Sequence, residues 1–573
     1  MKNREIADIF EKMADILEFK GENPFKVNAY RKASRVIKDL VEDIEEIWQQ
    51  GKLYDLPGIG DALVKKIVEY LTSGKIGKYE EIRQDVSPEL LNLLNIQNLG
   101  PKTLALAHHR LRVNNIDDLI RVINDGSLAE LPGMGQKKVE NISKGIQIFL
   151  AARERISIAT ALPIVEEIID QLKQSIKNII ISPAGSVRRM KETVGDIDIL
   201  ATSDTPDEII EAFISLPQVQ DVLAAGKTKA SVRYSSDQIQ VDLRVVPKES
   251  YGAALQYFTG SQAHNIRIRG IAKKLGLKVN EYGAFRDELK IAGASEQEVY
   301  NAVELPWIPP EMREDNGEIE LAIEGRLPAL VELGDILGDL HVHSNYSDGH
   351  ATIENMLHHA KKLGYQYLAI CDHSQRARYA QGLTIERILM QLAEIDTLNK
   401  KYADFKVLKG IEVDILNDGS LDCPDDILQQ LDIVIASIHS GFSIKPTERI
   451  LKALEHPLVD IIGHPTGRLI SQRSGYEIDL QKILEKAKQT NKALEINAYP
   501  DRLDLSDINA RKAMDMGIIL AINSDAHSEK TLGNLKYGIG IARRAWLTKA
   551  NILNCQSWQE ILEWKKTRQL HRG

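Results

Sequence analysis

Three acidic residues have a spacing that suits divalent metal ions. Asp196 and Asp198 lie two apart in an apolar run that predicts a β-strand, and a strand sends residues i and i+2 to the same face. The pair alone would also suit a solvated strand edge. Asp242 lies in a second predicted strand, residues 239–245, in which apolar and polar residues alternate. Three carboxylates on neighbouring strands would serve two-metal nucleotidyl transfer, in which one ion activates an attacking oxygen and the other neutralises the leaving pyrophosphate.

A glycine and arginine turn precedes the aspartate pair. Gly185 and Ser186 offer a tight turn and a hydroxyl, and Arg188 and Arg189 offer two guanidinium groups. Together these groups suit a polyphosphate better than a single neutral ligand. The glycine-serine-x-arginine-arginine turn, the aspartate pair and the later lone aspartate resemble the family X DNA polymerases.

That resemblance implies how the incoming nucleotide is held. Its triphosphate would contact the turn before the aspartates, through Gly185, Ser186, Arg189 and Gly195. Eukaryotic members of the family usually have a serine just before that last glycine, and this chain has Val194. One phosphate contact is therefore missing, which should weaken nucleotide affinity without abolishing the chemistry.

A second segment resembles the sugar-discriminating part of the same family. Tyr257, Phe258 and Gly260 lie in the run Y-F-T-G-S, and the resemblance implies that ring and backbone crowd a ribose 2'-hydroxyl. Asn265 and Arg269 on the next predicted helix would reach toward the minor groove near the nascent pair. Lys273 and Lys274 on that helix are equally typical of a solvated basic face.

Histidines are concentrated in the last part of the chain, with 11 of the 14 after residue 340. Many follow short apolar runs that alternate with helical patterns, and ligands at the ends of strands separated by helices are typical of a barrel. Imidazole with carboxylate suits Zn²⁺, Mn²⁺ or Fe²⁺ rather than Mg²⁺ alone. The candidate ligands are His341, His343, Asp348, His373, Glu412, His439, His464, Asp525 and His527.

The order of these motifs resembles the polymerase and histidinol phosphatase domain, a distorted seven-stranded barrel with a trinuclear centre that hydrolyses phosphoesters. The resemblance implies three overlapping ligand sets. One metal would take His341, His343, Glu412 and Asp525; a second would share Glu412 and add His439 and His464; a third would take Asp348, His373 and His527. Four other histidines there, His350, His358, His359 and His456, are expected to be core or surface residues.

The first 155 residues contain an internal repeat. L56-P-G-I-G and L131-P-G-M-G each precede a helical pattern, and this is the helix-hairpin-helix signature, whose amide groups hold DNA phosphates without reading bases. A single copy would equally suit an ordinary turn, whereas two copies favour DNA binding. The predicted phosphate-contacting glycines are Gly58, Gly60, Gly133 and Gly135. A weaker third copy, residues 96–103, has Asn98 in place of the first glycine.

Lys66 follows the first hairpin. In the related eukaryotic repair polymerases, a lysine at this place forms a Schiff base with an abasic sugar. Lys26, Tyr30 and Lys75 are at positions where the resemblance implies that they would line the same pocket. Nearby cations could lower the pKa of a nucleophilic lysine. Contact of Lys65 and Lys66 with DNA phosphate is an equal alternative to a lyase.

The predicted fold is therefore multidomain: a helical helix-hairpin-helix region, an α/β nucleotidyltransferase palm with a thumb, and a C-terminal distorted (β/α)7 barrel. The expected parts are an N-terminal helical domain at 1–80, a helical DNA-binding region at 81–155, the palm at 156–247, the thumb at 248–318, a linker at 319–336 and the barrel at 337–573.

Composition favours a reducing compartment and local DNA contacts. The 573 residues have a net charge of -9, and the first 155 carry 24 basic and 24 acidic residues, so DNA would be held by local patches rather than by a global field. The three cysteines form no C-x-x-C pair, and the sequence begins with a charged helical pattern instead of a signal peptide. We expect a cytoplasmic, nucleoid-associated bacterial monomer without a membrane anchor.

These inferences predict a DNA polymerase that fills short gaps in DNA repair, with a 3'-5' exonuclease in the barrel that would also cleave abasic sites or remove 3'-phosphates. Its partners would be gapped or primer-template DNA and deoxynucleoside triphosphates. Its ions would be two Mg²⁺ or Mn²⁺ at the aspartates and up to three Mn²⁺ or Zn²⁺ in the barrel. The alternatives are a DNA-bound phosphoesterase for small molecules and an end-binding scaffold with an inactive polymerase.

Overall fold

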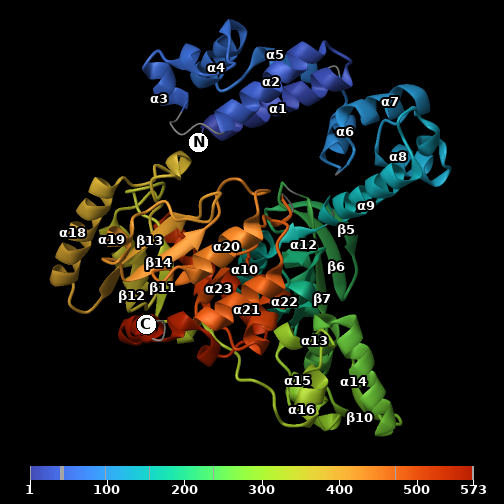
Figure 1. Ribbon diagram of the computed structural model, residues 1–573. Coiled ribbons are helices and arrows are strands. Elements are labelled where there is room, and N and C mark those ends of the chain that lie inside the picture. Colours follow the sequence, from blue (N-terminus) through green and yellow to red (C-terminus); the bar gives the residue numbers. More distant parts are fainter. Residues whose placement is uncertain are drawn as a thin grey trace. The chain divides into compact units, whose positions relative to one another are not determined.

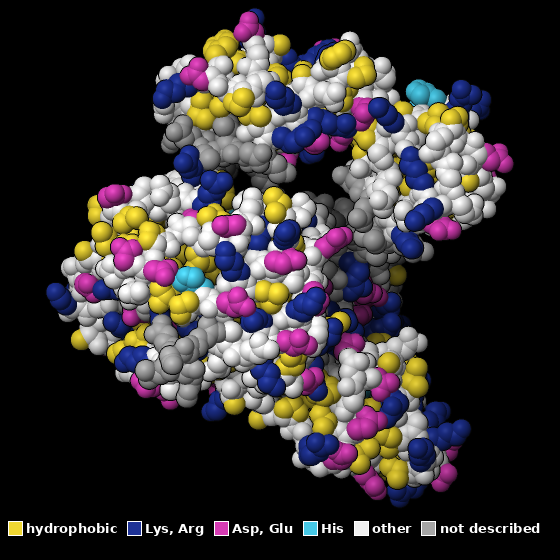
Figure 2. All heavy atoms as spheres, in the orientation of Figure 1, with side chains coloured by type: hydrophobic (Ala, Val, Ile, Leu, Met, Phe, Trp, Pro, Cys, Tyr) yellow, Lys and Arg dark blue, Asp and Glu magenta, His cyan; other side chains and the backbone are white. Residues whose placement is uncertain are grey.

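The computed structural model describes residues 2–38, 44–84, 86–96, 98–153, 155–236, 238–470 and 473–570. The chain divides into two units, Met1–Glu154 with Ala377–Gln381, and Arg155–Arg376 with Gly382–Gly573. Basic and acidic side chains are interspersed over the visible face of each unit (Figure 2). None of the described helices combines the length and apolar character that crossing a bilayer needs.

The first unit is helical, as the 3.6-residue spacing of its apolar residues predicted (Figure 1). Its core is built from residues such as Phe10, Ile37, Ile67 and Leu104, all fully buried. The helices are α1 (Lys2–Phe19), α2 (Pro24–Lys38), α3 (Ile44–Gln49), α4 (Asp61–Ser73), α5 (Gly77–Gln84), α6 (Pro88–Asn92), α7 (Pro101–Leu111), α8 (Ile116–Asn124) and α9 (Gln136–Arg153).

The second unit begins with the palm, a five-stranded sheet in the order β2-β4-β7-β6-β5. Strands β4 and β7 run parallel, and the other neighbours are antiparallel. The helices α10 and α12 pack together on this sheet. The elements are β1 (Ile156–Ser157), α10 (Ile158–Ser175), β2 (Ile180–Pro183), α11 (Gly185–Arg188), β3 (Thr193–Val194), β4 (Ile197–Thr202), α12 (Pro206–Ile214), β5 (Val219–Ala225), β6 (Lys229–Tyr234) and β7 (Ile239–Val245).

The thumb follows the palm and has a core of its own around Ile268, Val299, Tyr300 and Ile308. Three short antiparallel strands, in the order β10-β9-β8, lie among its helices. The elements are α13 (Tyr251–Thr259), α14 (Gln262–Lys274), β8 (Lys278–Asn280), β9 (Gly283–Arg286), β10 (Leu289–Ala292), α15 (Glu296–Ala302) and α16 (Glu318–Ile323).

The barrel has seven parallel strands in sequence order, β11 to β17, and a parallel bridge between Val342 and Ala526 joins its first and last strands. The predicted (β/α)7 architecture is thus confirmed. The strands are β11 (Gly338–Val342), β12 (Tyr367–Ile370), β13 (Lys406–Asp414), β14 (Ile433–Ser437), β15 (Ile461–Ile462), β16 (Ala493–Asn497) and β17 (Leu520–Asn523). The helices are α17 (Ile353–Lys362), α18 (Ile385–Lys401), α19 (Asp425–Leu428), α20 (Pro446–Glu455), α21 (Leu480–Thr490), α22 (Asp507–Asp515), α23 (Leu535–Arg544) and α24 (Trp558–Leu570).

The segment expected to be a linker packs against the barrel. Val331 is fully buried, and its amide donates to the carbonyl of Leu547 at 2.9 Å. The amide of Leu337 likewise donates to the carbonyl of Asn554 at 2.9 Å. Because the connection is hydrogen-bonded in this way, palm, thumb and barrel form one unit.

Candidate active sites

The palm carboxylates meet across one parallel strand pair. In the register of β4 and β7, Asp198 lies opposite Asp242, so both side chains project from the same face. Asp196 lies one residue before β4 begins at Ile197, and not inside the strand as its sequence context predicted. The structure therefore places the three predicted metal ligands at one edge of the strand pair.

The charges at this edge are concentrated. Burial raises the pKa of Asp198 to about 6, and the neighbouring carboxylates of Asp196 and Asp242 add to the effect. Asp242 forms an ion pair with Lys229, whose Nζ lies 2.9 Å from Oδ2 of Asp242. Burial opposes the charge of Asp242, but Lys229 helps to hold its pKa below the ordinary value. A divalent cation would relieve the repulsion that Asp196 and Asp242 exert on Asp198.

Gly185 touches the catalytic strand directly. Its φ is +57°, and a Cβ there would lie 2.5 Å from Oδ2 of Asp198, so a residue without a side chain is required. Ser186 lies in the same short helix, α11, and Gly195 immediately precedes the aspartates. The predicted triphosphate turn and the predicted metal ligands are thus in contact.

The two arginines of the turn have different surroundings. Arg188 forms a bidentate ion pair with Glu296 of the thumb, at 2.8 and 2.7 Å. Nε of Arg189 donates to Glu314 at 3.1 Å, and its Nη1 donates to the carbonyl of Thr259. Arg188 is therefore a structural tie between palm and thumb, and the Arg189 side chain lies beside the sugar-discriminating segment.

That segment ends α13. Gly260 has a φ of +72°, and a Cβ there would lie 3.1 Å from Nη1 of Arg189. Asn265 holds the segment, because its Nδ2 donates to the carbonyl of Tyr257 at 2.7 Å. The ring of Phe258 lies edge-on to Tyr257. Nε of Arg269 donates to the carbonyl of Asn265 at 3.3 Å.

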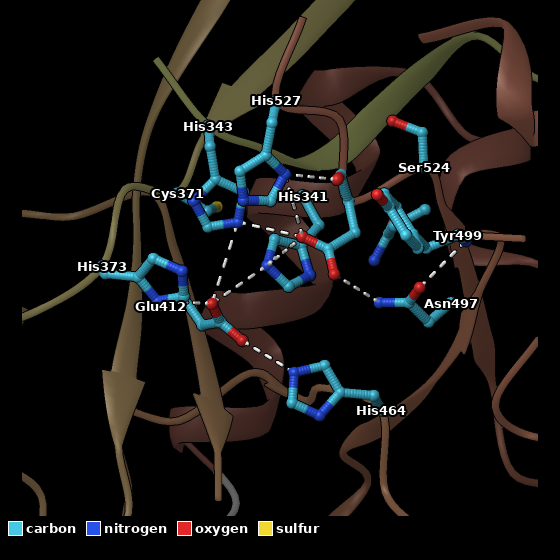
Figure 3. Close-up of polar contacts among 12 residues, drawn as sticks. His341, His343, Cys371, His373, Glu412, His464, Asn497, Tyr499, Ser524 and His527 are labelled. Carbon is cyan, nitrogen blue, oxygen red and sulfur yellow. Dashed lines mark hydrogen bonds and ion pairs between the residues drawn. The ribbon is translucent and has the colours of Figure 1, made fainter. Parts of the chain in front are cut away.

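All nine predicted barrel ligands come together at the C-terminal ends of the strands, around Glu412. Figure 3 shows His341, His343, His373, His464 and His527 around this carboxylate. Oε1 of Glu412 lies 3.2 Å from Nε2 of His439 and 3.1 Å from Nε2 of His464. Its Oε2 lies 3.0 Å from Nδ1 of His373 and 3.5 Å from Nε2 of His341. Nε2 of His343 also lies 3.8 Å from Oε2. A fully buried carboxylate shared by five imidazoles suits a cluster of metal ions better than a single ion.

Two further carboxylates complete the cluster. Oδ1 of Asp525 lies 3.1 Å from Nε2 of His343. Asp348 lies 3.4 Å from Nε2 of His527 and 3.6 Å from Nε2 of His373. Sets of ligand atoms close enough to hold an ion are His343, Asp348, His373 and His527; His341, His343 and Glu412; and His373, Glu412 and His439. These sets overlap with the expected ones but differ in two ways: they place His343 and His373 in two sets each, and they contain neither Asp525 nor His464.

The barrel residues fit metal ions on geometric grounds. Nε2 of His341 and both ring nitrogens of His343 are buried and make no hydrogen bond to any residue that the structure describes. Carboxylate oxygens nevertheless lie 3.1 to 3.9 Å from these nitrogens. Burial would raise the pKa of Glu412, but His439, His341 and His373 hold it well below its ordinary value. These imidazole nitrogens thus point toward ionised carboxylates without forming hydrogen bonds to them. Imidazole nitrogens and carboxylate oxygens together are a donor set that suits Mn²⁺ or Zn²⁺.

Sequence reasoning missed the residues that orient these ligands. Oε1 of Glu495 lies 2.7 Å from Nδ1 of His341, and Oε2 of Glu495 accepts from the amide of His464 at 2.7 Å. Oδ1 of Asp414 lies 2.5 Å from Nδ1 of His439. Both residues could have been found from the sequence. Asp414 lies two residues after the ligand Glu412, and strand periodicity brings residues i and i+2 to the same face. Glu495 lies near the end of the strand that follows His464, where it can orient a ligand.

Arg502 was also missed. Its Nε lies 4.0 Å from Oδ2 of Asp525. Burial opposes its charge, but Asp525, Tyr476 and Glu412 raise its pKa above the ordinary value. No spacing rule pointed to it, since it lies in the loop after β16 and approaches the cluster only in the folded barrel. A guanidinium at this edge suits a phosphate oxygen.

The hairpin glycines of the first unit have matching geometry. Gly58 and Gly133 have φ values of +85° and +76°. In the first hairpin the amides of Leu63 and Val64 donate to the carbonyl of Gly60, and in the second those of Lys138 and Val139 donate to that of Gly135. In the third copy Asn98 has a φ of +69°, so it takes the left-handed conformation that glycine takes in the other two; Gln97 lies outside the described residues.

Lys66 lies on α4 with its Nζ 3.0 Å from the carbonyl of Ala62. Burial lowers its pKa, and the positive charges of Lys78 and Lys26 act in the same direction. Lys26 was expected near Lys66, whereas Lys78 was not singled out from the sequence. An amine with a lowered pKa is a better nucleophile at neutral pH.

The fold and these clusters define an enzyme that joins a nucleotidyltransferase palm to a metal-binding barrel. Matching family models are a helix-hairpin-helix domain over residues 1–76, a SAM-like helix-hairpin-helix tandem over 90–147, a DNA polymerase beta thumb over 254–314 and a PHP domain over 339–499. The chain is 42% identical over 569 residues to the DNA polymerase/3'-5' exonuclease PolX of Bacillus subtilis (strain 168), covering 98% of this chain and 99% of that protein. The chain belongs to the bacterial family X DNA polymerases that carry a PHP domain.

Two more distant relatives match parts of the chain. A probable phosphatase of Thermoanaerobacter sp. (strain X514) is 34% identical over 231 residues, which is 38% of this chain and 89% of that protein. DNA polymerase lambda of Arabidopsis thaliana is 25% identical over 346 residues, covering 54% of this chain and 62% of that protein. The hairpin and thumb domains imply DNA as a partner, and the PHP domain implies metal dependence.

Proposed function

We propose that the palm extends DNA primers across short gaps. Asp196, Asp198 and Asp242 would hold two Mg²⁺ or Mn²⁺ ions. When bound, these ions supply activation of the primer 3'-hydroxyl and neutralisation of the leaving pyrophosphate. The observation that carries the proposal is the register that sets Asp198 opposite Asp242, with Gly185 against Asp198.

The surrounding residues of the chain would bind and select the nucleotide. Ser186 and Arg189 would hold the triphosphate of an incoming deoxynucleotide, with Gly185 and Gly195 allowing close approach of the backbone. Tyr257, Phe258 and Gly260 would exclude a ribose 2'-hydroxyl, and Asn265 supports this choice because it holds the carbonyl of Tyr257. Arg269 would face the minor groove.

We propose that the barrel removes nucleotides from the 3' end. Its nine ligands would hold up to three Mn²⁺ or Zn²⁺ ions, which when bound supply a nucleophile and charge neutralisation for phosphodiester hydrolysis. The chain's own contribution is to orient the imidazoles through Glu495 and Asp414 and to face the phosphate with Arg502. The same centre would act on abasic sites or 3'-phosphates.

The hairpins would hold gapped or primer-template duplex by its backbone. Gly58, Gly60, Gly133 and Gly135 would present amide groups to phosphates. Since these contacts read no bases, the enzyme would act at gaps of any sequence. We further propose that it acts as a monomer and associates with the nucleoid.

One experiment tests both activities. A 5'-labelled primer in a gapped duplex is incubated with Mn²⁺, with and without deoxynucleotides. Asp196→Ala should abolish lengthening and leave shortening intact, and His343→Ala should do the reverse. Retention of both activities in either variant would contradict the assignment of one activity to each cluster.

A small-molecule phosphoesterase is the second candidate for the barrel, favoured by the similarity to a probable phosphatase. Turnover of a histidinol-phosphate-like monoester without shortening of the labelled primer would support it. If the wild-type chain neither lengthens nor shortens the primer but binds its end, the chain is an end-binding scaffold.

A lyase at Lys66 is a further candidate, and the lowered pKa beside Lys78 and Lys26 favours it. Borohydride should trap a covalent adduct on a 5'-deoxyribose-phosphate end, and Lys66→Ala should remove the adduct. Lys65→Ala is the matched control, since it removes the neighbouring cation alone. If the wild type, Lys66→Ala and Lys65→Ala gave equal yields of the trapped adduct, Lys66 would not be the nucleophile and its role would be limited to contacting DNA phosphate.

A further inference from the structure

The barrel contacts the turn that carries Arg189. Nη1 of Arg544, the last residue of α23, donates to the carbonyl of Arg189 at 2.9 Å. Arg468, in the loop after β15, forms an ion pair with Glu192 at 2.7 Å. Between these contacts Gly540 packs so closely on Met190 that a Cβ on the glycine would lie 2.6 Å from Cε of Met190. Residues 189–192 are therefore held by the barrel at three successive points.

Arg544 also touches the carboxylate that holds the Arg189 side chain. Its Nη1 donates to Oε1 of Glu314 at 3.0 Å, and Nε of Arg189 donates to the same oxygen at 3.1 Å. The other side of the Arg544 guanidinium is fixed to the barrel, because its Nε donates to Asp507 at 2.8 Å. The side chain of Arg544 is only 6% exposed, and its partners Glu314 and Asp507 are partly buried, so its hydrogen bonds fix the orientation of the guanidinium.

The shared carboxylate has a consequence for ligand binding. Burial opposes the ionisation of Glu314, yet Arg189, Arg544 and Lys191 hold its pKa below the ordinary value. An ionised, partly buried Glu314, whose side chain is 16% exposed, competes with any phosphate for the Arg189 guanidinium. Because Arg544 satisfies the same oxygen, Arg189 can turn to a phosphate without leaving this partly buried charge unpaired, which would be unfavourable.

Arg468 is close in sequence to a predicted metal ligand of the barrel. Arg468 follows His464 by four residues, and its Nη2 also donates to the carbonyl of Leu503. Helix α23 begins after the loop that carries Asp525 and His527. The 189–192 turn is thus contacted by the loop that carries His464 and by α23, the helix that follows the loop carrying Asp525 and His527.

We propose that Arg544 and Arg468 of the barrel are positioning residues for nucleotide binding by the palm: they fix the 189–192 turn, and Arg544 keeps Glu314 paired when Arg189 binds a triphosphate. The inference rests on the proposed role of Arg189 in the palm. It makes the barrel a structural part of the polymerase site as well as a separate hydrolase.

The first test is a change in nucleotide affinity. Full-length Arg544→Gln should raise the KM for a deoxynucleotide in single-nucleotide gap filling about tenfold, with kcat within about twofold, because a binding contact is weakened and not the chemistry. Equilibrium binding of the nucleotide to enzyme on a dideoxy-terminated primer should weaken by the same factor. Shortening of the 3' end should be unchanged.

A matched control lies on the same helix. Arg543 pairs with Glu311 at 2.7 Å in the same interface and does not reach the turn. Arg543→Gln should leave nucleotide affinity unchanged. Arg468→Gln, at the other contact, should raise the KM in the same direction as Arg544→Gln and gives a second test if the latter folds poorly, which thermal melting would show.

The competition by Glu314 is tested by rescue. In the double variant Arg544→Gln with Glu314→Gln, no ionised carboxylate retains Arg189, so nucleotide affinity should return to within about threefold of wild type, a non-additive result. Unchanged affinity in Arg544→Gln, an equal loss in Arg543→Gln, or absence of rescue would overturn the inference. Failure of the wild type to extend a primer would instead overturn the proposed function.

Discussion

Asp198 lies opposite Asp242 in the parallel pairing of β4 with β7, and Gly185 lies against Asp198 from the turn before the strand. This arrangement joins the predicted metal site to the predicted triphosphate site without any intervening side chain. Small changes in the turn should therefore be transmitted directly to the carboxylates.

Gly185→Ala should inactivate the polymerase. Its Cβ would lie 2.5 Å from Oδ2 of Asp198, at a backbone φ of +57° that alanine tolerates poorly. Displacing a catalytic group by about 1 Å costs on the order of 100-fold in rate, so primer extension should fall by at least that factor. Gly226→Ala is the control, because a Cβ there meets its nearest atom at 3.6 Å. Full extension by Gly185→Ala would show that the turn can move freely away from the strand.

Asp198→Asn should stabilise the metal-free protein while abolishing extension. The folded-state pKa of Asp198, about 6, lies above the ordinary value of 3.8. The ionised form is therefore disfavoured by folding, and this loss is fully present above pH 6. At pH 7.5 with chelator, the variant should be more stable by on the order of 1–3 kcal/mol.

The pH dependence shows whether the higher stability of Asp198→Asn comes from removing the ionised carboxylate or from another consequence of the substitution. The advantage of Asp198→Asn should fade as the pH falls through 6 toward 4, because the wild-type carboxyl is then protonated in the folded protein. Melting temperatures at pH 7.5 and 4.5 measure it, with the exposed Asp204→Asn as control. An advantage of equal size at both pH values would show that ionisation of the Asp198 carboxyl is not its cause.

Glu296→Gln should destabilise the thumb. Glu296 accepts from Arg188 and from the fully buried Arg313, at 2.7 Å in each pair, and from Trp307 at 3.0 Å. Removing its charge leaves a buried guanidinium uncompensated, which costs about 3–5 kcal/mol. Fluorescence of Trp307 during denaturation should show earlier unfolding, and extension should fall while 3' shortening persists.

The acid stability of the thumb follows from the same group. Burial opposes the charge of Glu296, but Arg188 and Arg313 lower its pKa to about 2, from 4.5. Its contribution is thus complete above pH 4.5 and is lost as the pH falls toward 2. The difference between wild type and Glu296→Gln should shrink over that interval, and a constant difference would rule out the charge as its source.

Glu495→Gln should lower the metal content of the barrel. Glu495 orients His341 through Nδ1 and fixes the backbone of His464, both at 2.7 Å. Loss of such an orienting carboxylate weakens metal affinity by about 10- to 100-fold. Metal retained after dialysis, measured by atomic emission, should fall along with 3' shortening, whereas Glu485→Gln on the exposed face of α21 should retain both. Normal metal content in Glu495→Gln would mean that packing alone orients the imidazoles.

Local sequence motifs, with the family resemblance that they carry, predicted the fold class and singled out the candidate palm and barrel ligands. Alternation along residues 239–245 places Asp242 on one face of a strand, and ligands such as His341 and Glu412 end apolar runs of strand length. These signals are local, because side-chain direction in a strand depends only on parity. Asn98 in the third hairpin was the ambiguous case, since its left-handed backbone depends on the surrounding turn.

Only the tertiary structure decided which residues meet across long separations. The pairing of Glu495 with His341 spans 154 residues, and the contact of Arg544 with the carbonyl of Arg189 spans 355. Sequence periodicity predicts which face of a strand or helix a residue lies on, but it does not predict which other element that face contacts. The contact is set by how strands and helices pack against one another. The sequence thus determined that this chain has two clusters of metal-type ligands, and the packing of the barrel on the palm decided that helix α23 of the barrel contacts the turn that carries Arg189.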